Sequence, residues 1–184
     1  MNGARLMRAQ ARNNAWANLW LLSACAALGE EEFGAQCQGF FPSLRVTLNH
    51  ILIIDHFHVD ALEGGSLGPA AWADREPCRN MSTLQGAQGA MDRRLIALCD
   101  ALDESGLSRI IAVNRMVRIQ RERCDRLLLH LFQHQIHHRG QAHGMLGRDA
   151  PQLDEFYCLG EAPQRANEFT APGFSEQDIW QEAR

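Results

Sequence analysis

Apolar residues recur at intervals of three and four along four long stretches of the chain, the spacing that places them on one face of an α-helix. The first stretch runs from about Ala4 to Leu28, and the second follows Ser43, a favourable N-cap residue, and ends at Leu62. The third covers about Ser82 to Glu104, and the fourth about Glu122 to Leu146. The pattern therefore predicts an all-α fold with four long helices.

A β-branched and partly alternating segment, IIAVNRMVRIQ at residues 110–120, separates the last two predicted helices. It predicts a small hairpin that turns near Asn114 and Arg115. Residues 30–42 combine acidic residues with Gly and Pro, and residues 64–82 are rich in Gly, Pro and small side chains. Both segments are expected to be connections without regular structure.

Beyond Pro151 the helical pattern fades, and only residues 153–159 and 175–182 are predicted as short helices. Three aromatic residues of this tail, Phe169, Phe174 and Trp180, need a surface to pack on, either the rest of the chain or a second subunit. A length of 184 residues is typical of one domain. We expect a single domain over residues 1–184, with a core at about 4–150 and a C-terminal extension at 151–184.

The N-terminal residues admit a second interpretation, because three arginines precede the apolar run WANLWLLSACAAL, as in a secretory signal. Asparagines interrupt the apolar character of this region, and an amphipathic first helix accounts for it better. No apolar stretch approaches the roughly 20 residues that span a membrane, so we expect a cytoplasmic protein without a membrane segment. The residues at helical spacing are Leu6, Ala9, Asn13, Trp16 and Trp20.

Charge and cysteine usage exclude several function classes. Acidic residues exceed basic ones by 22 to 18, and the basic residues, all of them Arg, are scattered. Nucleic-acid binding depends on clustered positive charge, so no nucleic-acid contact is expected. The cysteines at positions 25, 37, 78, 99, 124 and 158 form no CxxC pair and no zinc-ribbon spacing, which is typical of free thiols in a core.

Histidines are concentrated in LLLHLFQHQIHHRGQAHGM, residues 127–145, which holds five of the eight in the chain. Residues four apart on a helix differ by only about 40° in direction, so His134 and His138 share one face. Burying several imidazoles together costs free energy unless each has a partner, and a bound cation supplies one. On the second predicted helix, His50 interrupts an otherwise apolar face. The spacing therefore predicts a metal site made by His50, His134 and His138.

Other polar residues of the fourth predicted helix are expected around this site rather than as ligands. Gln141 lies one turn beyond the histidine pair and is a candidate for a hydrogen bond to a ligand or a substrate. His130 and His137 are expected beside the site or at the surface. Arg139 points about 140° away from the first histidine of the pair, which favours a salt bridge to a neighbouring helix or subunit.

The string HQIHH at residues 134–138 lacks the Glu that a zincin carries after its first histidine, so peptide hydrolysis of that type is disfavoured. Three neutral imidazoles leave a divalent ion with open positions, which distinguishes a reactive site from a closed structural one. The 64–82 connection is long enough to cover the metal end of the fold, with Trp72 either lining a pocket or packing on the surface.

Three segments of the chain resemble the DinB/YfiT-like family of damage-inducible metalloenzymes. They are ARNNAWANLWLL at residues 11–22, LNHIL followed by Asp55 at residues 48–55, and HLFQHQIHHRGQAHGML at residues 130–146. They are spread over most of residues 9–150, and HxxxHRGQ is the most specific of these strings. The sequence departs from the family pattern at Asn13 and at the triplet His56-Phe57-His58, where aromatic residues are usual.

The resemblance implies a four-helix bundle that holds a divalent metal, most often nickel or zinc, on His50, His134 and His138. It also implies a homodimer and a metal-dependent enzyme, of the thiol-dependent transferase or hydrolase type, acting on a small molecule together with a low-molecular-weight thiol. The alternative is a stress-induced, non-catalytic binding module in which the metal is structural. A solvent-reachable metal favours the enzyme, and a closed coordination shell favours the module.

Overall fold

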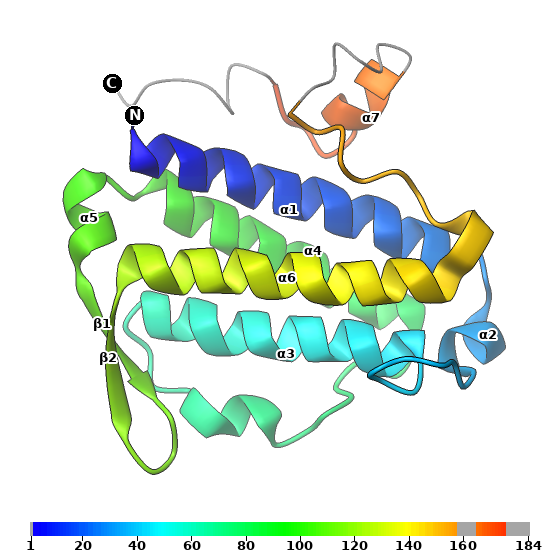
Figure 1. The fold of residues 1–184 in the computed structure, drawn as a ribbon, viewed down its shortest axis with the longest axis horizontal. Helices are drawn as coiled ribbons and strands as arrows, with labels where there is room; N and C mark the ends of the chain where they lie inside the picture. The colour runs from blue at the N-terminus through cyan, green and yellow to red at the C-terminus, as the bar shows by residue number, and fades with distance from the viewer. Residues whose placement is uncertain (1, 158–164, 176–184) are drawn as a thin grey trace.

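The computed structural model describes residues 2–157 and 165–175 and is mostly helical, with one small antiparallel sheet. Four long helices lie side by side (Figure 1). The predicted long helices are therefore confirmed, with shifts of a few residues at their ends. Their bounds are α1 (Gly3–Ala26), α3 (Leu44–Leu62), α4 (Met81–Asp100) and α6 (Cys124–Leu146).

Short elements connect the long helices. The predicted hairpin is confirmed, with Ile110 paired to Arg123 and Asn114 paired to Ile119 at its two ends. It extends from the end of the molecule at which α6 begins (Figure 1). The short elements are α2 (Glu30–Gly34), η1 (Gly68–Trp72), α5 (Glu104–Ser108), β1 (Ile110–Asn114), β2 (Ile119–Arg123), η2 (Gly147–Asp149) and α7 (Ala166–Thr170).

Side-chain caps explain where three of the long helices begin. The side chains of Asn2, Ser43 and Asn80 each accept a hydrogen bond from the backbone N–H three residues later, at 3.0, 3.2 and 2.9 Å. Each bond satisfies one of the N–H groups that the first turn of a helix leaves without a partner. The predicted cap at Ser43 is confirmed.

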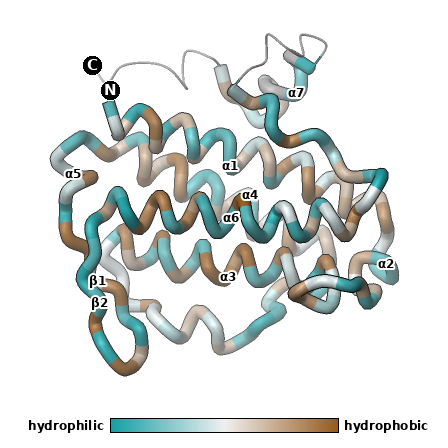
Figure 2. Tube along the Cα trace, in the orientation of Figure 1, coloured by the Kyte–Doolittle hydropathy of each residue, from teal (hydrophilic) through white to brown (hydrophobic). Residues whose placement is uncertain are grey.

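Helix α1 packs along α4 and α6, and α3 packs along α6 and α4. The main hydrophobic core lies among these four helices and includes fully buried leucines such as Leu21, Leu52, Leu95 and Leu128. Helix α3 is the most apolar of the four (Figure 2). It also packs against η1 and β1, so more of its surface is removed from water.

Several predicted boundaries are wrong for local reasons. The third helix stops at Asp100 because Asp103 caps a separate short helix, accepting a bond from the Gly106 N–H at 2.7 Å. The fourth begins at Cys124, since β2 continues to Arg123. Residues 30–34 form α2 instead of an irregular connection. Residues 153–157 are not helical, and the rest of the predicted helix at 153–159 and nearly all of that at 175–182 lie outside the described residues.

The apolar stripe predicted for the first helix is real, but it is not the side that faces the main core. Ala9 and Trp16 belong to a second, smaller cluster that Ala17 and Phe156 complete. Leu153, Phe174 and Trp20 pack at its edge, so the tail covers this side of α1. The expected surface for Phe174 is thus found, whereas the side chain of Phe169 and all of Trp180 lie outside the described residues. Helix α1 is buried on two sides, and the predicted apolar stripe corresponds only to the side that the tail covers.

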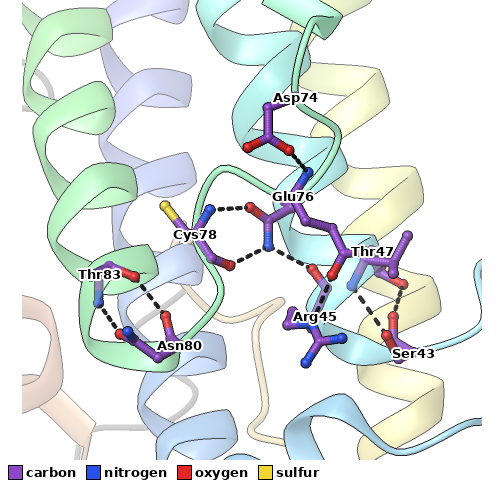
Figure 3. A network of polar contacts seen from close by, with 10 residues as sticks. Ser43, Arg45, Thr47, Asp74, Glu76, Cys78, Asn80 and Thr83 are labelled. Atoms are coloured by element: carbon purple, nitrogen blue, oxygen red, sulfur yellow. Dashed lines mark hydrogen bonds and ion pairs between the residues drawn. The ribbon is translucent and has the colours of Figure 1, made fainter.

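The connection between α3 and α4 is fixed to α3 by polar contacts (Figure 3). Arg45 forms an ion pair with Glu76 at 2.7 Å. The Asn49 side chain exchanges two hydrogen bonds with the backbone of Cys78, at 2.8 and 2.9 Å. Nearer its start, the connection places Trp72 in a stack on Phe57 with ring centroids 4.7 Å apart. Trp72 is therefore held by packing on α3.

Within residues 2–157 and 165–175, none of the helices combines the length and the hydropathy that a bilayer crossing needs.

Candidate metal centre

The antiparallel neighbours α3 and α6 bring His50, His134 and His138 together. One nitrogen of each ring lies within 4.8 Å of the corresponding nitrogens of the other two. The Nε2 atoms of His50 and His134 are 3.0 Å apart, and the three pairs of ring centroids are separated by 4.4 to 5.0 Å. Two ligands about 2.0 to 2.1 Å from one divalent ion are themselves roughly 3 Å apart, so the nitrogens of His50 and His134 already have the spacing of two ligands of one ion.

The electrostatics of the three rings favour the neutral imidazole. Burial, with a smaller contribution from the neighbouring imidazole of His138, lowers the pKa of His50 to about 4. Burial and then the charges of His138 and His50 lower the pKa of His134 to about 3. Burial also lowers the pKa of His138. Neutral imidazole is the form that binds a metal, so the site needs no deprotonation at neutral pH.

Gln141 fixes the tautomer of His138. The His138 Nδ1 lies 2.8 Å from the Gln141 Oε1, which only accepts, so Nδ1 carries the proton and Nε2 presents its lone pair. The Gln141 side-chain amide in turn donates to Nε2 of His137 at 3.2 Å. The structure therefore places Gln141 against a histidine of the triad and His137 one step further out, at the surface.

An aromatic ring covers the triad from a segment that sequence reasoning did not single out. The centroid of Phe41 lies 4.7 Å from that of His50 and 5.5 Å from that of His138. His50 and His134 are nevertheless only half-buried, so solvent reaches part of each of these two residues. The expected cover, residues 64–82, instead makes the contacts with α3 described above.

The structure places His130 away from the triad, in contact with a histidine that the sequence reading left unused. The His130 ring is exposed, and its centroid lies 5.2 Å from that of the buried His58. His58 Nδ1 donates to the Ile54 carbonyl at 3.0 Å, which leaves the lone pair of Nε2 buried without a partner. Buried Nδ1 of His134 also lacks a partner. The imidazoles thus continue beyond the triad along the contact between α3 and α6.

A buried polar network on the other side of these helices was missed. Its charged members are Asp55, Asp92 and Arg139, each at most 6 % exposed. Amide side chains connect them: Gln88 donates to both carboxylates, at 2.9 and 3.3 Å, and Gln135 donates to Asp55. Asn14 and Asn18 of α1 donate to Asp92 and accept from Arg139.

Among the described residues, Arg139 makes none of the predicted salt bridges to a neighbouring helix, and the predicted alternative of a salt bridge to a second subunit stays a prediction. Its hydrogen-bond partners are the neutral amide oxygens of Asn14, Asn18 and Gln135. One signal in the sequence pointed to this network: the pairs 14/18 and 135/139 are polar residues four apart, the same spacing as the histidine pair.

The sequence model of the DinB family matches residues 4–164. The chain belongs to the DinB family. A comparison with curated proteins finds no significant match. Membership of the DinB family and the clustering of His50, His134 and His138 are both compatible with metal binding.

The donor set of this DinB-family chain fits a divalent transition metal. Imidazole nitrogen suits zinc, nickel, copper and iron, whereas magnesium and calcium prefer oxygen ligands. Among the described residues, no Asp, Glu or Cys joins the three histidines as a further ligand. Three protein ligands leave at least one position of a four-coordinate ion for a water or substrate, which is the pattern of reactive zinc sites.

Proposed function

We propose that this DinB-family protein is a divalent-metal-dependent enzyme whose ion, nickel or zinc, is held by His50, His134 and His138. The observation that carries the proposal is the convergence of three neutral imidazole nitrogens from α3 and α6 within 4.8 Å. The side-by-side arrangement of α1, α3, α4 and α6 supports the four-helix bundle that the resemblance implies. An ion bound to three imidazoles can activate a thiol or polarise a carbonyl at its open positions.

The remaining residues prepare the site for that ion. Gln141 holds His138 in the tautomer that offers Nε2. Phe41 excludes part of the solvent from His50 and His138, and the half-buried rings of His50 and His134 leave an approach for a small molecule. We propose a small organic substrate together with a low-molecular-weight thiol. This exposure favours the enzyme over the alternative, a binding module with a structural metal in a closed shell. The homodimer stays a prediction.

Metal analysis of untagged protein tests the ligand set. We expect about one equivalent of a divalent transition metal in the wild type and a loss of nearly all of it in His134→Ala. His56→Ala is the matched control, because His56 is half-buried like His134 but lies on α3 outside the triad. This variant should keep its metal. Equal metal content in wild type and His134→Ala would remove the triad from the ligand set.

Cobalt substitution separates the enzyme from the structural alternative. The visible spectrum of the Co²⁺-loaded protein reports the ligands of the ion, so an added low-molecular-weight thiol should change the spectrum if a position is open. A spectrum that stays constant at saturating thiol, together with no metal-dependent turnover in thiol-transfer and hydrolase assays, would favour the binding module.

A further inference from the structure

A cavity lies on the side of α6 that faces away from the histidine triad. It has a volume of about 450 Å³ and lies between α1, α6 and residues 152–157. At about 100° per residue, the residues that α6 contributes to it point roughly 120 to 180° away from the middle of the histidine pair. Its lining includes Asn13, Ile136, Arg139, Gly140, His143 and Tyr157.

Arg139 is the unusual member of this lining, because it is a buried cation with no paired anion among the residues that the structure describes. Its residue is 5 % exposed, and its Nη1 donates to amide oxygens alone. Across residues 2–157 and 165–175, no carboxylate lies within 4.0 Å of its guanidinium, and neither Nε nor Nη2 makes a hydrogen bond. Arg139 lines the cavity, and neither atom is among the buried polar atoms that lack a partner.

Arg12 shows what the same fold does with another buried arginine. It is 8 % exposed, and it forms a two-pronged ion pair with Asp100 at 2.7 and 2.9 Å. Charged residues are almost never fully buried unless they are paired, because water otherwise stabilises the charge better. The open prongs of Arg139 are therefore suited to an anion from outside the chain.

The buried carboxylates of the network do not supply that anion in full. They reach Arg139 only through the amides of Asn14, Asn18 and Gln135. Burial raises the pKa of Asp55 to about 8 and that of Asp92 to about 7, so near neutral pH each carries less than a full negative charge. Burial lowers the pKa of Arg139 only to about 10, which leaves it charged.

We propose that this cavity binds a small carboxylic acid with an apolar body, its carboxylate on Nε and Nη2 of Arg139. The planar guanidinium matches the two oxygens of a carboxylate in geometry and charge. Ala17, Ile136 and Leu153 supply an apolar wall for the body of the ligand. The volume lies within the range of about 300 to 1,000 Å³ that is usual for ligand pockets. The carboxylate of Asp154 at the exposed rim disfavours dianions.

Calorimetric titration of the full chain with 2-naphthoate and with its neutral isostere 2-naphthamide tests this site. We expect naphthoate to bind about 10- to 100-fold more tightly than the amide, as for other charge-assisted pairs. Equal affinities would overturn the proposal. So would the absence of naphthoate binding at millimolar concentration, which would make Arg139 a structural counter-charge of the network.

A filled cavity provides the decisive variant, since replacing Arg139 itself could unfold the chain. A Cβ at Gly140 meets no atom within 4 Å, and Gly140 lines the cavity, so Gly140→Leu should occupy it and abolish naphthoate binding. The matched control is Gly144→Leu, one turn along α6 at an equally open position outside the cavity. Naphthoate binding that survives Gly140→Leu would overturn the proposal. His134→Ala should leave it unchanged, which keeps this site distinct from the proposed metal centre.

Discussion

Helix α6 carries two pairs of polar residues, His134 with His138 and Gln135 with Arg139, which are offset by one position and lie in different environments. His134 and His138 face α3, where the Nε2 of His134 meets only another imidazole nitrogen, that of His50 at 3.0 Å, and its buried Nδ1 has no hydrogen-bond partner among the described residues. Gln135 and Arg139 face the interior, where amides from α1 and a carboxylate from α3 meet them. The same spacing of four thus gives two different results. His134 and His138 are suited to bind an ion, whereas Gln135 and Arg139 form most of their hydrogen bonds with other protein groups. The first should govern metal content and the second stability.

The largest effect expected from this contrast is on stability. Arg139→Ala removes the donor from three buried amide oxygens and the positive charge from beside two buried carboxyl groups. We expect the free energy of unfolding to fall by about 3 to 5 kcal/mol. His138→Ala, in metal-free protein, should change it by less than about 1 kcal/mol. Urea unfolding of both variants measures the difference, and similar losses would mean that the two pairs do not divide their roles.

A smaller effect is expected on metal affinity. Gln141→Leu keeps the size of the side chain and removes the acceptor that orients His138. Loss of such a partner weakens metal binding by about 10- to 100-fold, which competition with a chromophoric chelator measures. The apo stability should hardly change. A wild-type affinity in Gln141→Leu would show that His138 needs no orienting group.

The pH dependence of stability has opposite signs for the triad histidines and for the carboxyl groups of the buried network. The buried histidines have lowered pKa values, so below about pH 6.5 the unfolded chain binds more protons and stability is lost as the pH falls. The pKa values of Asp55 and Asp92 are raised to about 8 and 7, so the folded chain holds the extra protons and stability falls as the pH rises.

Metal-free protein should therefore lose stability, on the order of 1 kcal/mol, between about pH 6.5 and 8, where the two carboxyl groups ionise while the histidines are already neutral in both states. Asp55→Asn should reduce this loss, as measured by urea unfolding at a series of pH values. The same slope in Asp55→Asn and wild type would assign it to other groups.

The smallest effect concerns the helix itself. Gly144 lies in α6, is exposed, and has open space where a Cβ would be. Gly144→Ala should raise the free energy of unfolding by about 0.5 to 1 kcal/mol through helix propensity alone. Neither the metal content nor the pH slope should move. A change in either would indicate that rigidity of α6, rather than its two polar pairs, sets those properties.

The sequence was sufficient for the part of this molecule that follows from periodicity. Apolar spacing located α1, α3, α4 and α6, and the spacing of His134 and His138 identified a shared face because it depends only on helix geometry. The convergence of His50 with that pair additionally required α3 and α6 to be neighbours, which the spacing alone only suggested and the family resemblance implied.

What the sequence did not reveal depends on contacts between segments. Asp55, Asp92 and Arg139 are residue types usually found at the surface, so their burial could not be read without knowing that amides from α1 would meet them. The position of Phe41 over the triad follows from the path of a loop, which has no periodicity. The stripe containing Trp16 was recognised, but its cover comes from a tail more than a hundred residues away.

The three imidazoles also have a topological meaning. His50 and His134 are 84 positions apart in the chain. An ion bound by both residues would therefore act as a staple, a cross-link between α3 and α6 that closes a loop of nearly half the polypeptide. Closing a long loop in this way restricts the unfolded chain far more than the folded one, as a disulfide does. Unlike a disulfide, the staple opens with chelators or acid. The moment at which the ion is bound would then determine how long an individual molecule stays folded.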